Sequence, residues 1–227
     1  MNRWSVEHVT GTAGELHQLD VDWSRRSVRV NHVTAPAIVL GSAQVGADVI
    51  DEASAERSGS EVVTRRSGGG VVLLAPGDHV WLDVVVPRDD PLWDDDVSRA
   101  GWWLGEAWAS AITALGRQPG VDHVAIHRRG VSDRTLGRLV CFAALGPGEV
   151  VIDGRKAVGV SQRRTRGGAR FQCTAMTTWD PQATLSVIRP ELVTQDLVEA
   201  LTARVVALEP WWGEVGDLVT DVFARVE

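Results

Sequence analysis

Three groups of residues in this sequence could do chemistry, and the first surrounds its single lysine. Lys156 stands among 23 cationic residues, of which the other 22 are arginine. Arginine can replace lysine at most solvated positions, but its guanidinium is planar and permanently charged, whereas an ammonium is a compact point charge. The composition alone leaves Lys156 evenly balanced between a chance survivor and a residue whose ammonium is needed.

The surroundings of Lys156 favour a function. It follows an Asp153-Gly154 pair, which is a turn signal in a β-hairpin. A lysine just past a tight turn, with small residues after it, can point its ammonium into a pocket while the neighbouring backbone contacts something bulky. Four residues beyond the lysine are candidates for substrate contact: Gly159, Val160, Ser161 and Gln162.

The second group is a run of three glycines that follows two arginines. Consecutive glycines between strands lose conformational entropy on folding and pack no side chains, so they suit a place where a ligand approaches the backbone. Arg65 or Arg66 could then bind a carboxylate, phosphate or thioester oxygen. A glycine-rich turn or bulge is the alternative. The candidate binding residues are Arg65, Ser67, Gly68, Gly69, Gly70 and Val71.

The third group is centred on Cys141, between an apolar, strand-like run and a Gly-Pro-Gly loop. An ordinary buried thiol is the simpler interpretation, but near Lys156 it becomes a plausible nucleophile. Cys173 is expected to be a wall of the site, and both cysteines are expected to be free thiols. The histidines show no convincing metal-ligand spacing, so no metal is predicted.

The composition describes an ordinary globular chain. With 227 residues, 44% of them hydrophobic and 23% charged, it can bury a sizeable core as one domain, or as one domain plus a small appendage. A net charge of −7 argues against a nucleic-acid groove or an anionic membrane surface. The apolar runs are too short for a membrane span, and the N-terminus lacks a secretory pattern, so we expect a cytoplasmic protein.

The elements that must position these residues form an α+β mixture. A helix is predicted over 94–116, with acids in its first turn, and 191–207 and 215–226 have helical periodicity. Two hairpins are predicted, one joining 71–74 to 80–86 around a Pro-Gly-Asp turn and one turning at Asp153-Gly154. Segments predicted to be strands are 26–31, 37–41, 61–65, 71–74, 80–86, 121–127 and 149–156.

Taken in order, these segments resemble the lipoate-protein ligase and octanoyltransferase family, whose catalytic fold is shared with biotin-protein ligases. The most specific part is Gly-Arg-Lys-Ala-Val-Gly-Val-Ser-Gln-Arg-Arg around Lys156, close to the family's Gly-Arg-Lys-x-x-Gly-Ser-Ala-Gln-Arg-Arg. Leu-Gly-Ser-Ala-Gln, ending at Gln44, is similar to the family's Gly-x-x-Gln. The resemblance implies an α+β fold with a mixed or antiparallel sheet, a catalytic domain over 1–180 and a helical extension packed on it over 181–227.

The resemblance also implies a function. Such enzymes attach an octanoyl or lipoyl group to a lysine of lipoyl-domain proteins, such as the glycine cleavage H protein and 2-oxoacid dehydrogenase E2. Cys141-Phe142 matches a Cys-Phe pair of the cysteine-type octanoyltransferases. By this resemblance, Cys141 takes an octanoyl group from acyl carrier protein as a thioester and Lys156 helps to stabilise the oxyanion, with no cofactor.

Two alternatives remain open. An ATP-dependent ligase would use free lipoate or octanoate with ATP and Mg²⁺, and Cys141 would be incidental. Family ligases usually carry an accessory C-terminal domain, for which the roughly 45 residues after Asp180 are few, so transfer is favoured unless a partner subunit supplies the domain. A non-catalytic binding module is the other alternative, because Leu74-Ala75 stand where many relatives have His-Asp.

Overall fold

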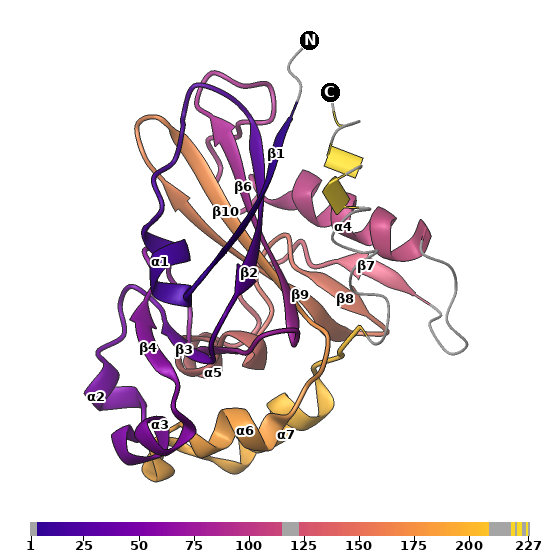
Figure 1. Ribbon diagram of the computed structural model, residues 1–227. Coiled ribbons are helices and arrows are strands. Elements are labelled where there is room, and N and C mark those ends of the chain that lie inside the picture. The colour runs from indigo at the N-terminus through magenta and orange to yellow at the C-terminus, as the bar shows by residue number, and fades with distance from the viewer. Residues whose placement is uncertain (1–3, 115–122, 209–218, 221, 224–225, 227) are drawn as a thin grey trace.

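The computed structural model describes residues 4–114, 123–208, 219–220, 222–223 and 226 (Figure 1). These residues form a seven-stranded sheet, a three-stranded sheet and several short helices. The larger sheet has β1 parallel to β2, and every other neighbouring pair is antiparallel. In spatial order, its strands are β1 (Ser5–Gly11), β2 (Ser27–Val33), β6 (His79–Pro87), β10 (Gly168–Met176), β9 (Arg155–Arg164), β8 (Val150–Ile152) and β7 (Val124–Ile126).

The smaller sheet has β3 (Ala37–Leu40) at its centre, parallel to β4 (Glu61–Thr64) and antiparallel to β5 (Val72–Leu74). Figure 1 shows α4 beside β7 and β8, and α2, α3, α6 and α7 at the end of the molecule beyond the smaller sheet. The helices are α1 (Ala13–Gln18), α2 (Gly46–Val49), α3 (Glu52–Ser58), α4 (Trp102–Ala114), α5 (Arg134–Leu139), α6 (Pro181–Ser186) and α7 (Gln195–Ala203), with 3-10 turns η1 (Cys141–Ala143) and η2 (Pro190–Leu192).

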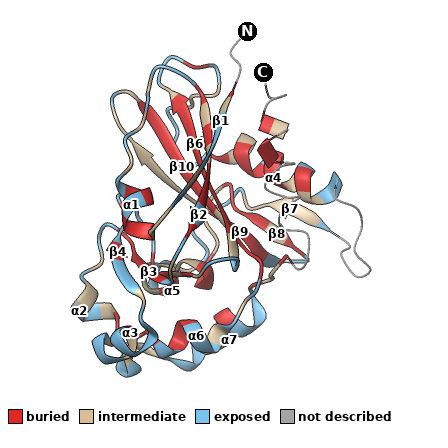
Figure 2. Ribbon diagram, viewed as in Figure 1, coloured by how far each residue is buried: buried red, intermediate tan, exposed pale blue. Residues whose placement is uncertain are grey.

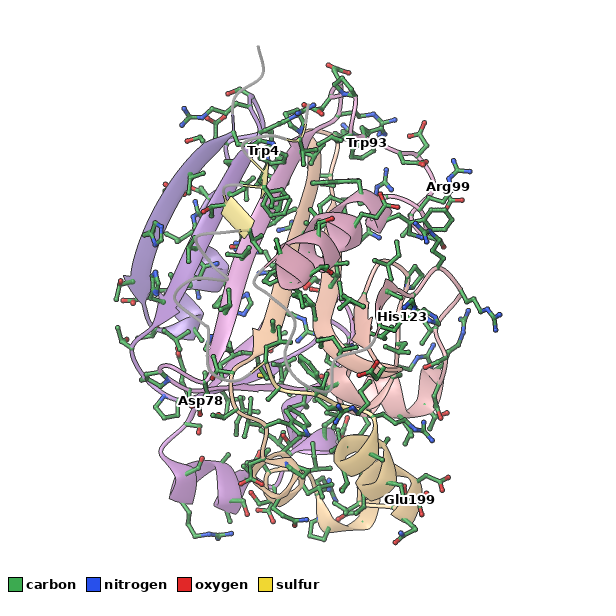
Figure 3. The ribbon with its side chains drawn as sticks, turned by 90° about the vertical axis from the view of Figure 1, so that its right-hand side faces the viewer. Trp4, Asp78, Trp93, Arg99, His123 and Glu199 are labelled. Carbon is green, nitrogen blue, oxygen red and sulfur yellow. The ribbon has the colours of Figure 1, made fainter. Side chains whose placement is uncertain are left out.

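Two hydrophobic cores lie on opposite faces of β6. Leu82 and Val84 face a core that includes Trp108 of α4, while Trp81 faces a second core that contains Phe142 and Leu201. Because successive side chains of a strand alternate between faces, β6 is buried on both sides (Figure 2). In the view turned by 90° (Figure 3), α4 lies across the large sheet, and α7 lies at the opposite end of the molecule from Trp4 and Trp93.

The α+β class and most predicted strands are confirmed, but the hairpin joining 71–74 to 80–86 is wrong. The turn itself exists, since the amide of Asp78 donates to the carbonyl of Ala75 at 3.2 Å. However, β5 pairs with β3 in the smaller sheet, and β6 lies between β2 and β10. Turn residues reverse the direction of the chain, but they do not determine which strands pair in the sheet. Because β6 is buried on both faces, it has a neighbouring strand at each edge, β2 and β10.

The hairpin predicted at Asp153-Gly154 is confirmed between β8 and β9. The helix predicted over 94–116 begins later, at Trp102, and residues 115–116 lie outside the described part of the chain. Its expected acidic first turn is instead a series of tight turns, in which Asp94 and Asp96 accept the backbone amides two residues ahead. Such local side-chain bonds compete with a helix, which explains the late start.

Other differences concern helices and strands that were not predicted from the sequence. The apolar, strand-like run before Cys141 is the helix α5, and β1 and β10 were not predicted. The segment 191–207 contains α7, whereas most of 215–226 lies outside the described residues. In the part that the structure describes, no helix is long and apolar enough to cross a bilayer.

Candidate active site

Lys156 is positioned by the hairpin between β8 and β9. Asp153 and Gly154 both have positive φ, 49° and 78°, which is the geometry of a tight two-residue hairpin turn. Lys156 is the second residue of β9, and its backbone amide donates to the carbonyl of Arg204 at 2.7 Å. The chain that leaves α7 therefore holds this strand from outside, and the Lys156 side chain points inward with only 2% of its surface exposed.

The ammonium of Lys156 has an acceptor for each of its three N–H bonds. Nζ donates to the carbonyl oxygens of Cys141 at 2.7 Å and Ala144 at 3.0 Å, and to the carboxylate of Glu149 at 2.8 Å. It also lies 5.0 Å from the centroid of the Phe142 ring. A buried charge is stable only when it is paired and hydrogen-bonded, and this set of contacts meets both conditions.

Glu149 is the residue in contact with Lys156 that was not predicted from the sequence as part of the site. Its side chain is 4% exposed and, besides Lys156, accepts the backbone amides of Gly146 at 2.7 Å and Val160 at 3.1 Å. Glu149 thereby ties the loop before β8 to the middle of β9. A carboxylate at the start of an otherwise apolar strand, seven positions before the only lysine, is the signal that could have identified it.

Cys141 is brought to Lys156 by the glycine run. The amide of Cys141 donates to the carbonyl of Val71 at 3.0 Å, and the amide of Val71 donates to the carbonyl of Leu139 at 2.9 Å. A side chain at Gly70 would lie 2.6 Å from the backbone of Leu139 and Val140, so only glycine permits this approach. The half-buried Cys141 then has its Sγ 3.9 Å from Nζ of Lys156.

Arg65 holds the shape of the glycine run. The buried guanidinium donates to the carbonyls of Gly68 at 2.8 and 3.2 Å and of Gly70 at 2.9 Å. Burial lowers the pKa of Arg65, an effect that the nearby Cys141 opposes. Most of its donors are therefore committed to the loop, while Arg66 is exposed.

A buried polar network lies beneath the glycine run. Ser67 Oγ is 3.0 Å from Ser161 Oγ and donates to Oε1 of Gln172 at 3.0 Å. The amide nitrogen of Gln172 donates to Asp83 at 3.0 Å and lies 3.2 Å from Nδ1 of His17. The network joins the glycine run, β9, β10 and α1 into one support.

This network also fixes the state of His17. Asp83 can only accept, so the nitrogen of the Gln172 amide must face it, and the same nitrogen then donates to Nδ1 of His17. The ring proton of His17 is consequently on Nε2. Burial is the main cause that lowers the pKa of His17 to about 4, so the ring is neutral near pH 7.

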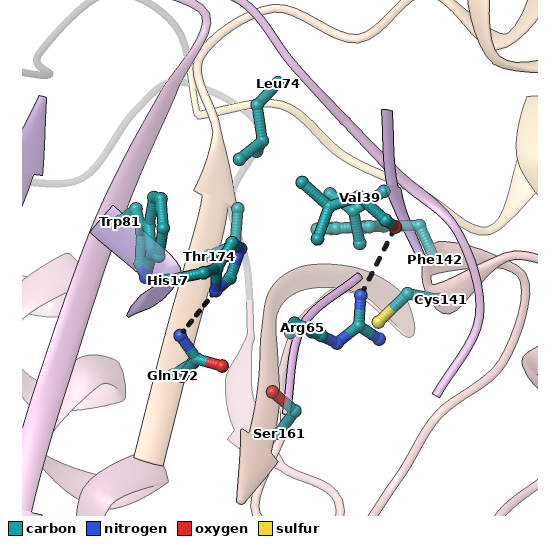
Figure 4. Close-up of a pocket in the computed structure, with 12 residues that line it drawn as sticks. His17, Val39, Arg65, Leu74, Trp81, Cys141, Phe142, Ser161, Gln172 and Thr174 are labelled. Carbon is teal, nitrogen blue, oxygen red and sulfur yellow. Dashed lines mark hydrogen bonds between the residues drawn. The ribbon is translucent and has the colours of Figure 1, made fainter. Parts of the chain in front are cut away.

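Cys141 and Ser161 stand between two cavities. The first, here called the narrow cavity, has a volume of about 410 Å³ including its mouth (Figure 4). Its walls are mainly apolar and aromatic side chains, with a few polar groups. Its lining residues are His17, Val39, Arg65, Val72, Leu74, Trp81, Cys141, Phe142, Gly159, Ser161, Gln172 and Thr174.

The second, here called the wide cavity, has a volume of about 990 Å³ including its open side. Its walls are more polar and include Lys156, Glu149 and two exposed arginines, Arg134 and Arg138. The predicted site residues that also line this cavity are Gly68, Gly69, Val160, Ser161 and Gln162. Ser67, Gly70 and Val71 line neither cavity and act as supports.

Cys173 was expected to be a wall of the site, and that expectation is wrong. Its side chain is fully buried on the opposite face of β10, in the core beneath α4. Burial raises the pKa of its thiol to about 12, so Cys173 is not a nucleophile at neutral pH. Among the described residues, no group of three or more His, Cys, Asp or Glu side chains is arranged to bind a metal ion.

The chain matches a family of known proteins over most of its length. The family model described as the lipoyl protein ligase A/B catalytic domain matches residues 22–223. No match is found among curated protein sequences.

Several solved structures share the fold. A bipartite lipoate protein ligase from Thermoplasma acidophilum superimposes with a TM-score of 0.73 at 15% identity, over 99% of this chain and 84% of that chain. Lipoate-protein ligase A bound with ATP gives a TM-score of 0.69 at 15% identity, with the same shares covered. LipL1 of P. falciparum in complex with lipoate gives 0.68 at 9% identity, over 98% of this chain and 62% of that chain.

Proposed function

The chain belongs to the lipoyl protein ligase A/B catalytic domain family and is an enzyme of protein lipoylation, and from that premise we propose that it transfers its acyl group through a thioester on Cys141. The donor is octanoyl-acyl carrier protein, and the acceptor is the lysine of a lipoyl-domain protein, such as E2 or the glycine cleavage H protein. The reaction takes place in the cytoplasm and needs no cofactor.

One observation carries this proposal: the Cys141 thiol lies at the junction of the two cavities and beside an ammonium. Its sulfur is 3.9 Å from Nζ of Lys156, and the residue lines both cavities. The narrow cavity offers Val39, Val72 and Phe142 to an alkyl chain, whereas the open, wide cavity gives room for the arm of a carrier protein. The other cysteine, Cys173, has no access to either cavity.

The two steps balance without an added reagent. In the first, the Cys141 sulfur attacks the carbonyl carbon of the donor thioester, a new C–S bond forms, and the carrier thiol leaves with the proton that Cys141 gives up. In the second, the ε-amine of the acceptor lysine attacks the same carbon. An amide forms, the bond to Cys141 breaks, and the proton of the amine returns to sulfur.

Lys156 contributes its positive charge to both steps. Each step passes through a tetrahedral state with negative charge on oxygen, and a fixed charge beside it lowers the barrier. Because all three N–H bonds already have acceptors, Lys156 stabilises the oxyanion through the electrostatic field of its charge. It donates a hydrogen bond to the oxyanion only where the substrate displaces the carbonyl of Cys141 or Ala144. Glu149 is the positioning residue that keeps the ammonium beside the sulfur.

The direct test is the acyl-enzyme itself. The protein is incubated with octanoyl-acyl carrier protein and examined by intact mass spectrometry, with Cys141→Ala and Cys173→Ala as the matched pair. We expect an octanoyl adduct on the wild type and on Cys173→Ala and none on Cys141→Ala. An adduct that survives in Cys141→Ala, or no adduct in any of the three proteins, would refute the thioester.

A second candidate is ATP-dependent ligation of free lipoate or octanoate. The wide cavity favours it, because Arg134 and Arg138 are exposed on its wall without an acidic partner among the described residues, and such arginines suit phosphate oxygens. These residues would hold the phosphates of ATP with Mg²⁺, and the nucleotide would supply activation of the carboxylate. Lipoate-protein ligase A, whose fold this chain shares, is described with bound ATP.

The two candidates differ in their dependence on Cys141. A lipoyl domain is incubated with the enzyme and either octanoyl-acyl carrier protein or lipoate, ATP and Mg²⁺. Modification that requires ATP and persists in Cys141→Ala would identify a ligase. Modification from the carrier protein without ATP, lost in Cys141→Ala, would identify a transferase.

A further inference from the structure

A third cavity adjoins the narrow cavity at Leu74. It has a volume of about 580 Å³ including its open side, and its walls include Leu73, Met176 and Trp179. Leu74 belongs to the walls of both the narrow cavity and the third cavity, and no other residue is shared between them. Cys141 and Ser161 are shared between the narrow and wide cavities. The wide, narrow and third cavities therefore follow one another in that order, with Leu74 between the narrow cavity and the third cavity.

Leu74 is held firmly in this position. It is the last residue of β5, its side chain is buried, and its backbone lies opposite Ala37 in the ladder with β3. Figure 4 shows Leu74 and Ser161 at opposite ends of the close-up. An alkyl chain that starts at the junction by Ser161 and follows the narrow cavity thus has the Leu74 side chain at its far end.

Two aromatic rings complete the partition. Phe142 lines the narrow cavity and Trp179 lines the third cavity, and their ring centroids are 5.4 Å apart. The indole of Trp179 is anchored because its Nε1 donates to the carbonyl of Leu201 at 2.8 Å. Of the side chains that separate the cavities, the isobutyl group of Leu74 is the one whose removal needs no rearrangement of an anchored ring.

We propose that Leu74 is the end-stop that limits the length of the acyl chain, and that its removal lets a longer chain enter the third cavity. The inference rests on the proposed function, since it takes the narrow cavity as the site of the acyl chain carried by Cys141. A chain that fits the narrow cavity meets Leu74 with its methyl end, whereas a longer one must displace a buried side chain from a packed strand. Each methylene that gains an apolar cavity is worth a factor of about four in binding.

The test is a competition between chain lengths. Wild type, Leu74→Ala, Val72→Ala and Leu74→Met are given equal amounts of octanoyl- and dodecanoyl-acyl carrier protein, and the Cys141 adducts are quantified by intact mass. Val72 is the matched control, because it lies on the same face of β5 and lines the narrow cavity but not the third cavity. Leu74→Met conserves volume.

We expect the wild type to favour octanoyl and Leu74→Ala to raise the dodecanoyl-to-octanoyl ratio at least tenfold. Val72→Ala and Leu74→Met should keep the wild-type ratio within about twofold, whatever their overall rates. Leu74→Ala should also lower the melting temperature by roughly 5–15 °C. If it does not fold, Leu74→Val is used, with a smaller shift in the same direction.

The outcomes separate the end-stop from the proposed function. Octanoyl adducts on the wild type with an unchanged ratio in folded Leu74→Ala, or an equal change in Val72→Ala, would overturn the role of Leu74 and leave the thioester intact. No adduct from either donor would instead overturn the thioester. Calorimetric binding of free octanoate and dodecanoate then tests the end-stop without transfer, and an unchanged preference in Leu74→Ala would reject it.

Discussion

At the scale of single residues, the site depends on a charge pair of which the sequence reveals one half. The single lysine is conspicuous in a chain with 22 arginines, but its counter-charge, Glu149, is one of 30 acidic residues. The pair is nearly inaccessible, with side chains 2% and 4% exposed. A guanidinium would not fit three acceptors that converge on one small cation, which explains why lysine persists here.

Replacing Glu149 by glutamine should destabilise the protein and the site together. The variant leaves the Lys156 ammonium buried without a counter-charge, which costs about 3 kcal/mol of the free energy of unfolding. Urea denaturation measures this loss, and octanoyl transfer should fall at least tenfold because the ammonium is no longer held beside Cys141. Glu106→Gln is the control, since the ion pair that Glu106 forms with Arg128 is exposed. Equal effects of the two substitutions would show that the buried pair has no special role.

At the scale of elements, the site is a junction between a strand hairpin and a corner formed by α5 and η1. Two backbone hydrogen bonds of Val71 join this corner to the glycine run. The amide of Val71 donates to the carbonyl of Leu139, and the carbonyl of Val71 accepts from the amide of Cys141. Gly70 allows the two backbones to approach, and Arg65 fixes the carbonyls around it. The glycines thus position the cysteine, in addition to any contact that they make with a ligand.

Gly70→Ala should therefore impair the reaction without touching either cavity. A methyl group at this position would lie 2.6 Å from backbone atoms of Leu139 and Val140, so the corner that bears Cys141 must move. Overpacking of this kind costs about 1–3 kcal/mol, and the rate of acyl-enzyme formation should fall at least tenfold. Both are measurable, by denaturation and by timed intact mass. Gly130→Ala is the control, because none of the residues that the structure describes, apart from its chain neighbours, lies within 4 Å of its added methyl group. A similar loss in that variant would contradict the prediction.

At the scale of the whole molecule, two cores on opposite faces of β6 hold a site that lies on one face only. Helices α1 and α7, which are far apart in the sequence, both contribute to the site-side core, which contains Phe142, Ile188 and Leu201. His17, which belongs to the polar network around Gln172, lies within the same layer as this core, so the folded state buries a titratable imidazole. Acidification should consequently affect the stability of the entire chain.

We expect the free energy of unfolding to fall as the pH decreases from about 6.5 to 4. Burial lowers the pKa values of His17 and His79 to about 4, so in this range the unfolded chain binds protons that the folded chain does not. Each histidine can account for up to about 3 kcal/mol, present above pH 6.5 and lost towards pH 4. Denaturation at several pH values measures the slope, which should shrink in His79→Phe and stay unchanged for the exposed His123→Gln. An equal slope in all three proteins would refute this origin.

Residue types and spacing indicated which segments are candidates for the chemistry. They marked the lone Lys156 after a hairpin turn, the glycine run and Cys141, the family resemblance favoured a function for them over the structural alternatives, and the structure places all three together. Local rules marked these segments because turns, glycine conformations and strand periodicity act over a few residues. The same rules gave the α+β class and the β8–β9 hairpin.

Only the folded structure shows which strands pair and which side chains are neighbours. The strand pairing of β5, the acid that neutralises Lys156 and the burial of Cys173 on the far face depend on contacts between residues distant in the chain. Residue types do not specify such contacts, because one carboxylate or one apolar strand resembles another until packing selects among them. Residue types therefore predict which groups are reactive, whereas packing between distant parts of the chain decides which of them meet and how the cavities around Cys141 and Leu74 are divided.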